Sequence, residues 1–157
     1  MDEASFTRET LALAPALYRI CMSILHCDAD AQDAVQQCLL KAWVHRENAH
    51  QERFRAYVAK IAVNECYNIR RYRKRVCPVE EIWDAREAEP PDMDIRDAVA
   101  ALHEKLRVPL LLKYRENFSE KEIAQALGIP VSTIKSRLYR ARRTLQKALR
   151  DVEVSFE

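Results

Sequence analysis

The chain has 157 residues, of which 48% are hydrophobic and 32% charged, a balance typical of a folded protein with one domain or two small ones. It holds a single glycine and few β-branched runs, which argues against sheets and predicts an all-α fold. No apolar run is long enough to cross a membrane and the N-terminus carries no secretion signal, so we expect a cytoplasmic protein.

Two amphipathic helices are predicted at the N-terminal end. Apolar residues recur at three- and four-residue steps over residues 4–26, where Pro15 marks a kink or a nearby true helix start. The pattern returns over residues 30–46, for which Asp28 or Asp30 offers a cap. We expect the inner stripes to hold Leu11, Ala14, Leu17, Tyr18, Cys21, Ile24 and Leu25, and then Ala31, Ala34, Val35, Cys38, Leu39 and Ala42.

A third helix is expected over residues 53–75, after a polar connector at 47–52. One face is apolar and the other is strongly basic, with a net charge of +7 over the helix. Tyr67 and Tyr72 are interleaved with the charges. Basic side chains follow phosphates while aromatic rings stack on unpaired bases, so this face is suited to nucleic acid. A solvated, charged helix end is the alternative.

The helical pattern breaks over residues 76–97, where prolines accompany a net charge of −6. We therefore predict an acidic linker at 76–94 between a first domain at 1–75 and a second at 95–157. Helices at 95–103 and 105–116 would open the second domain, with Pro109 in the first turn of the latter or as a kink. Their expected inward residues are Ile95, Val99 and Leu102, and then Leu106, Leu110, Leu111 and Tyr114.

The sequence pattern of residues 118–150 predicts two helices joined by a tight turn. Ser119 and Glu122 form a capping box, with Phe118 and Ile123 beside it as a hydrophobic staple, so a helix starts at about residue 120. Gly128 ends this helix, because glycine adopts the left-handed conformation without strain.

The second of these two helices has a one-sided basic face. Pro130 separates it from the first helix, and Ser132 or Thr133 is the expected cap. Residues 119–150 have a net charge of +6, and the inner stripe comprises Ile134, Leu138, Ala141, Leu145 and Leu149. This arrangement is typical of a helix-turn-helix, whose second helix enters the major groove of DNA. A solvated amphipathic helix pair is the alternative.

The sequence patterns offer no metal or catalytic site. The five cysteines include no CxxC pair, and Cys21, Cys38 and Cys66 fall on apolar stripes, which favours buried reduced thiols over metal binding or redox sensing. The histidines match no ligand spacing, so we predict neither a metal nor a cofactor. The sequence shows no catalytic constellation or glycine-rich phosphate loop, so a nuclease or other enzyme is not expected.

Three segments together resemble the extracytoplasmic-function (ECF) sigma factors of the sigma-70 superfamily, which keep only regions two and four. FSEKEIAQALGIPVSTIKSRLYRARRTL is similar to region four. DAQDAVQQCLLKAW at 30–43 is similar to the clamp-binding helix of region two, and FRAYVAKIAVNECYNIRRYRKR at 54–75 to the rest of that region. The resemblance implies a factor that binds core RNA polymerase, directs it to specific promoters and helps to open the DNA.

The resemblance also implies roles for individual residues. Polymerase binding would involve Asp33, Gln36, Gln37, Leu40 and Trp43. The minus-ten box would be held and melted by Asn48, His50, Tyr57, Lys60, Asn64, Asn68 and Arg71. The upstream, minus-thirty-five box would be read by Ser132, Thr133, Lys135, Ser136, Arg137 and Arg140. Because the family often uses anti-sigma factors, such a protein joins core polymerase and promoter DNA among the expected partners.

A stand-alone transcription regulator is the alternative to a sigma factor, with the N-terminal half as a ligand sensor or dimerisation domain. Such a domain needs neither the basic face at 53–75 nor an acidic linker. Co-purification with core polymerase would separate the two hypotheses.

Overall fold

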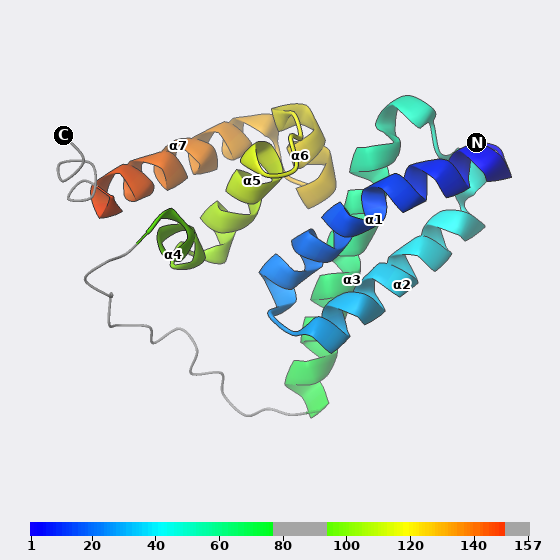
Figure 1. The fold of residues 1–157 in the computed structure, drawn as a ribbon, viewed down its shortest axis with the longest axis horizontal. Helices are drawn as coiled ribbons and strands as arrows, with labels where there is room; N and C mark the ends of the chain where they lie inside the picture. The colour runs from blue at the N-terminus through cyan, green and yellow to red at the C-terminus, as the bar shows by residue number, and fades with distance from the viewer. Residues whose placement is uncertain (77–93, 150–157) are drawn as a thin grey trace.

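The computed structural model describes residues 1–76 and 94–149, and every regular element in that part of the chain is a helix (Figure 1). The predicted all-α fold is therefore confirmed. Most of the predicted linker and the predicted tail after Arg150 lie outside the described residues, so the domain boundaries stay a prediction. The elements are α1 (Glu3–Leu25), α2 (Asp28–Val44), the short 3-10 helices η1 (Arg46–Asn48) and η2 (Gln51–Arg53), α3 (Phe54–Val76), α4 (Ile95–Ala100), α5 (Glu104–Tyr114), α6 (Glu120–Leu127) and α7 (Val131–Ala148).

Helices α1, α2 and α3 pack against one another on one side of the molecule, and α4 to α7 lie on the other (Figure 1). Small residues along α2, such as Ala34 and Cys38, are fully buried and allow its neighbours to come close. At one end of this bundle, the ring of Phe6 meets Trp43 at 5.2 Å and Phe54 at 5.7 Å between centroids, both edge to face. This geometry is favourable for aromatic pairs.

The inward stripe predicted for α1 is correct in its second half and wrong at Leu11. Leu17, Cys21 and Ile24 are buried, whereas Leu11 is 71% exposed, because at this turn it is the adjacent Thr10 that faces the core. The predicted cap of α2 is also wrong. Its N-cap residue is Cys27, and both candidate aspartates lie inside the first turn, where their charge still favours the positive end of the helix dipole.

The cysteines in the described part of the chain are free thiols. Cys21, Cys38 and Cys66 are buried, as predicted from their positions on apolar stripes. Burial raises the pKa of Cys38 to about 12, and its sulfur lies 3.3 Å from the backbone oxygen of Val58. Its thiol therefore stays protonated at neutral pH and serves as a small core residue.

The first two helices of the C-terminal half differ in detail from the prediction. Helix α4 ends at Ala100, with Asp94 as its N-cap, and Ile95 is 60% exposed while Ala98 is buried in its place. In α5, Pro109 lies in the second turn and is buried, and Tyr114, the last residue of the helix, is 56% exposed. The predicted inward positions of Ile95 and Tyr114 are therefore wrong.

The helix-turn-helix agrees closely with its sequence signals. Ser119 Oγ accepts the backbone N–H of Glu122 at 3.1 Å, and the Glu122 carboxylate accepts that of Ser119 at 2.9 Å, which confirms the capping box. Gly128 adopts the left-handed conformation with φ of 70°. The predicted cap of α7 is wrong, since Pro130 is the N-cap residue and Ser132 and Thr133 already belong to the first turn.

Substitution of Gly128 with alanine should destabilise the protein by about 1–2 kcal/mol, the cost of a left-handed backbone for a residue with a Cβ atom. A Cβ at this position would meet no atom within 4 Å, so the backbone strain is the whole expected cost. Gly128→Asn should destabilise the protein less than Gly128→Ala, because asparagine tolerates the left-handed conformation better than alanine does. Urea unfolding of both variants tests this, and an asparagine variant less stable than the alanine variant would contradict it.

Candidate nucleic-acid interface

The residues predicted to read the upstream box lie on the first three turns of α7. Ile134, Leu138 and Ala141 are fully buried against the rest of the helix-turn-helix, and this fixes the opposite face of α7 outward. Of the six predicted residues, Ser132, Lys135, Ser136 and Arg140 are exposed, and Thr133 and Arg137 are half-buried. The helix therefore presents a basic, hydroxyl-rich face of the kind that binds phosphates and base edges.

The remaining arginines of α7 have partners within the C-terminal half. Arg142 donates a hydrogen bond to the hydroxyl of Tyr114 at 3.0 Å, and the guanidinium of Arg143 lies 5.9 Å from the centre of the Tyr139 ring. These two arginines of the second half of α7 are therefore engaged by tyrosines of the same half of the chain.

A pocket of about 430 Å³ opens beside the exposed face of α3. It is lined by Lys41, His45, Tyr57, Ile61, Asn64, Glu65, Tyr67, Asn68 and Arg71. The pocket therefore brings together four of the seven residues predicted for the minus-ten box: Tyr57, Asn64, Asn68 and Arg71. Asn48, His50 and Lys60 are exposed and do not line the pocket.

One wall of the pocket, which the C-terminal end of α2 supplies, was not predicted from the sequence. Lys41 comes from the last turn of α2 and His45 is the C-cap residue of that helix, and Lys41 forms an ion pair with the buried carboxylate of Glu65. Which helices pair is a tertiary feature, and the only sequence signal for these residues was their position four apart at the end of a predicted helix. At the rim, Arg71 donates a hydrogen bond to Asn68 Oδ1.

The pocket combines aromatic, amide and basic groups. Tyr57 and Tyr67 are half-buried. Burial raises the pKa of Tyr67, the negative charge of Glu104 raises it further, and the positive charges of Arg70 and Arg137 oppose the rise. Flat rings stack on unpaired bases, amides pair with base edges and arginine binds phosphate. The pocket is therefore suited to one or two unpaired nucleotides of a single strand.

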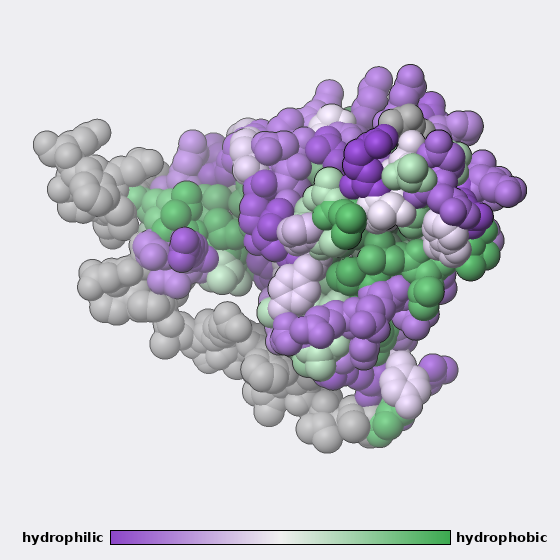
Figure 2. All heavy atoms as spheres, turned by 45° about the vertical axis from the view of Figure 1, so that its right-hand side comes forward, coloured by the Kyte–Doolittle hydropathy of each residue, from purple (hydrophilic) through white to green (hydrophobic). Residues whose placement is uncertain are grey.

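A third surface lies on the outward face of α2. The predicted polymerase-binding residues Asp33, Gln36, Gln37 and Leu40 are exposed there, and Val44 extends the row by one turn. Figure 2 shows apolar side chains gathered among hydrophilic ones on the side of the molecule where α1 and α2 lie. Trp43 differs from the other predicted residues, because it is half-buried, packs on Phe6 and has the Arg46 guanidinium 3.8 Å from its ring.

The described part of the chain contains neither a membrane-spanning helix nor a cluster of metal-ligating side chains. None of the helices described is long and apolar enough to cross a membrane. Residues 1–76 and 94–149 hold no group of three or more histidine, cysteine, aspartate or glutamate side chains that could bind a metal ion.

Comparison with known proteins adds two family matches. Residues 11–76 match the family model of sigma-70 region 2, and residues 92–145 match that of sigma-70 region 4. The chain is 30% identical to the ECF RNA polymerase sigma factor SigL of Mycobacterium tuberculosis, over 90% of this chain and 87% of that protein. It is 28% identical to the ECF RNA polymerase sigma factor SigW of Bacillus subtilis, over 87% and 84% respectively.

Solved structures include similar folds. The sigma factor RpoE from Bartonella quintana, in complex with the anti-sigma factor NepR, matches with a TM-score of 0.74 at 30% identity and covers 93% of this chain and 97% of its own. CnrH, in complex with the cytosolic domain of CnrY, matches with a TM-score of 0.67 at 22% identity. The match covers 96% of this chain and 90% of the CnrH chain.

Proposed function

The chain belongs to the ECF group of sigma-70 sigma factors, and from this membership we propose how its surfaces share the work of promoter recognition. Its function is to direct core RNA polymerase to specific promoters. We assign core polymerase binding to the outward face of α2, around Gln36 and Leu40. The observation that carries the proposal is that one chain presents two different nucleic-acid surfaces, the basic face of α7 and the pocket beside α3.

The two nucleic-acid surfaces fit different forms of DNA. The first turns of α7 are a regular helix with polar residues outward, which suits the major groove of duplex DNA. The pocket beside α3 suits an unpaired base of the minus-ten box. Unstacking such a base costs a few kcal/mol, and the ring and phosphate contacts of the pocket would offset this. Each surface alone binds weakly, and polymerase makes the second contact effectively intramolecular.

The proposal extends to the partners and the domain plan. Residues 1–75 would bind polymerase and the minus-ten box, residues 76–94 would link, and residues 95–157 would bind the upstream box. The chemistry of RNA synthesis would belong to the polymerase, so the factor itself would be no enzyme and would act in the cytoplasm. An anti-sigma factor is a further proposed partner, supported by the complex in which the similar RpoE was solved.

Run-off transcription with purified core polymerase and a genomic promoter library tests the proposed function. The protein should make bare core polymerase initiate at defined start sites, and it should co-purify with that enzyme. A protein that bound DNA but neither bound core polymerase nor supported initiation would instead be a stand-alone regulator.

Tyr57→Ala should impair strand opening more than the first binding of duplex DNA. The ring lines the pocket, and stacking of one base on an aromatic side chain is worth about 1–3 kcal/mol. Permanganate footprinting reports the open strands, and a filter-binding assay reports duplex binding. Tyr18→Ala is the matched control, because this tyrosine is half-buried like Tyr57 but belongs to α1 and does not line the pocket. An unaltered bubble in the Tyr57 variant would refute the assignment.

A further inference from the structure

The pocket beside α3 has an acidic residue in its lining, Glu65. In the sequence this is the only acidic residue among residues 54–76, where seven residues are basic. The side chain is nearly buried, and Lys41 of the α2 wall forms an ion pair with it. A carboxylate repels phosphate, so it does not serve the strand's backbone. Its place in a pocket suited to nucleic acid therefore points to a contact with another part of the nucleotide.

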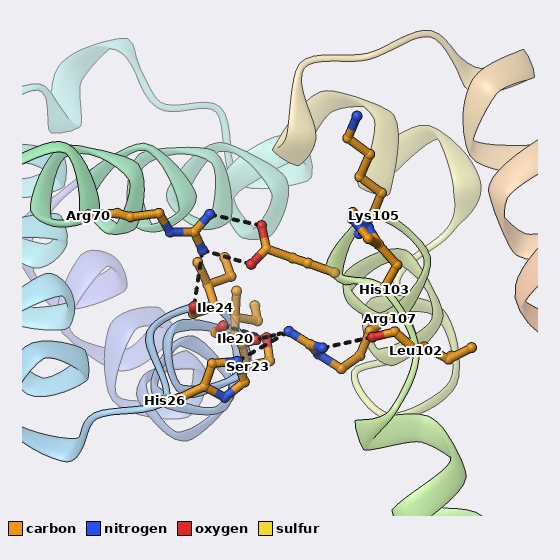
Figure 3. A network of polar contacts seen from close by, with 10 residues as sticks. Ile20, Ser23, Ile24, His26, Arg70, Leu102, His103, Lys105 and Arg107 are labelled. Atoms are coloured by element: carbon orange, nitrogen blue, oxygen red, sulfur yellow. Dashed lines mark hydrogen bonds and ion pairs between the residues drawn. The ribbon is translucent and has the colours of Figure 1, made fainter. Parts of the chain in front are cut away.

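Glu65 differs from two other partly buried glutamates in how much of its carboxylate is bonded. Figure 3 shows the usual case, in which Arg70 donates to both carboxylate oxygens of Glu104, at 2.7 and 3.1 Å. Glu122 likewise accepts from Arg55 with both oxygens, at 2.6 and 3.1 Å. In Glu65, Oε1 accepts a hydrogen bond from Lys41, and no group in residues 1–76 or 94–149 donates to Oε2. One oxygen of this carboxylate is thus left for a ligand.

The ion pair has a direction within the pocket. The side chain of Glu65 is 9% exposed and that of Lys41 is 51% exposed, so the carboxylate is the inner member and the ammonium the outer one. A base that leaves the stack stays joined to its sugar at the mouth of the pocket that receives it, and its Watson–Crick edge is read inside. The group opposite the glycosidic bond therefore comes closest to the carboxylate, and the strand's phosphates pass nearer to the ammonium.

A carboxylate at the inner position selects for a hydrogen-bond donor, because an ionised carboxylate only accepts hydrogen bonds. Cytosine and adenine carry an amino group on the edge opposite the glycosidic bond, whereas thymine and guanine carry a carbonyl oxygen there. An amino group would form a charge-assisted hydrogen bond with the carboxylate. A carbonyl oxygen would leave two acceptors facing each other with no proton between them, which is costly in a buried site.

Other groups of the pocket can complete the contact with such a base. The amide of Asn64 can donate to the ring nitrogen beside the amino group, which is an acceptor in both cytosine and adenine. Tyr57 offers a ring on which the base can stack. The half-exposed ammonium of Lys41 keeps donors that Glu65 does not use, and these suit a phosphate.

We infer that Glu65 is a specificity-determining residue, which accepts a hydrogen bond from the amino group of an unpaired cytosine or adenine, and that Lys41 is the positioning residue that holds the carboxylate in place. This inference rests on the proposed function and names the class of base that the pocket accepts. An ion pair that only fastened α2 to α3 would stabilise the fold without distinguishing one base from another.

Holoenzyme bound to a forked DNA tests the inference. The fork is taken from a promoter that run-off transcription identifies, and its non-template strand is unpaired across the minus-ten box. Each unpaired position carries in turn cytosine, uracil, adenine or hypoxanthine, and fluorescence anisotropy measures the dissociation constant. Within each pair, cytosine with uracil and adenine with hypoxanthine, the amino group is replaced by a carbonyl oxygen. At one position the amino base should bind at least about five-fold more tightly than its carbonyl counterpart.

Glu65→Gln separates base reading from a structural role. Glutamine keeps the size of the side chain, but its amide both donates and accepts, so the preference for the amino base should fall to about one-fold. The matched control is Glu120→Gln, which also takes a glutamate from a lysine, Lys113 at 3.6 Å, but at the start of α6 and outside the lining of the pocket. This control should keep the wild-type preference. Equal loss of affinity for all four bases in Glu65→Gln would overturn the inference.

Two variants of Lys41 test its positioning role. Lys41→Met removes the partner of the carboxylate and should reduce the preference for the amino base. Lys41→Arg keeps a cation that can hold the carboxylate and should retain the preference. If Lys41→Met showed the wild-type preference, Lys41 would not position Glu65.

The wild type alone distinguishes this inference from the proposed function. A holoenzyme that initiates transcription and binds the fork, but prefers the amino base at none of its positions, would overturn the inference and leave the proposed function standing. A chain that supports no initiation with core polymerase would overturn both, and it would already fail in the run-off assay.

Discussion

Leu138→Ala should lower the free energy of unfolding by about 2–5 kcal/mol, the range for leucine truncation in a packed core. Leu138 is fully buried in α7 and lies between Ile134 and Ala141 on the stripe that faces α5 and α6. The surrounding helices are fixed by their own contacts, so they would collapse only in part around the missing methyl groups. Urea unfolding followed by circular dichroism measures this loss.

Leu11→Ala is the matched control for that measurement, because it makes the same chemical change in a long helix at a position 71% exposed. We expect it to change the free energy of unfolding by no more than about 0.5 kcal/mol, as surface substitutions generally do. If both variants lost the same stability, the buried stripe of α7 would not be what holds the helix in place. The prediction also has a functional side, since a tilted α7 would no longer present Arg137 and Arg140 together.

Helix ends were predictable where the sequence holds a complete local signal. Helix α6 begins at the capping box of Ser119 and Glu122 and ends at the left-handed Gly128, as the sequence predicts. Such signals work because the groups that complete a helix end lie within about four residues of it. At α2 and α7 the predicted N-cap residue was wrong. Several polar residues follow one another there, and which of them begins the helix depends on the backbone conformation of the residues before it.

Burial was only partly predictable. A repeat of apolar residues identifies the face that a helix turns inward, but each turn is buried only if another helix covers it. Leu11, Ile95 and Tyr114 fit their stripes and are nonetheless exposed. Conversely, Arg107 and Glu116 are buried, although charged residues are usually exposed unless they are paired.

The candidate site divides in the same way. Tyr57, Asn64, Asn68 and Arg71, which the resemblance assigns to the minus-ten box, belong to a single helix and line the pocket together. Lys41 belongs to another helix, and its place in the pocket follows from the packing of α2 on α3. The contacts between the halves lie furthest from sequence reasoning, because partners such as Arg19 and Glu116 are 97 residues apart in the chain.

Arg137→Ala and Arg140→Ala should each weaken binding of the upstream box and leave core polymerase binding unchanged. An arginine that bonds a guanine edge with two hydrogen bonds is worth about 1–3 kcal/mol, so each change should weaken binding about 5- to 150-fold. Arg140 is exposed and Arg137 half-buried on α7, while the surface assigned to polymerase lies on α2 in the other half. Anisotropy with a labelled upstream-box duplex and reconstituted holoenzyme measures the loss.

Two comparisons separate base reading from charge in this experiment. Arg8→Ala removes the same charge from an exposed position on α1 and should leave upstream-box binding unchanged. A duplex with a scrambled upstream box should bind wild type and both α7 variants almost equally, because the remaining phosphate contacts carry no sequence information. If the variants lost affinity for core polymerase and for DNA in equal measure, the surfaces of α2 and α7 would not act separately, and the division of labour between the two halves would be wrong.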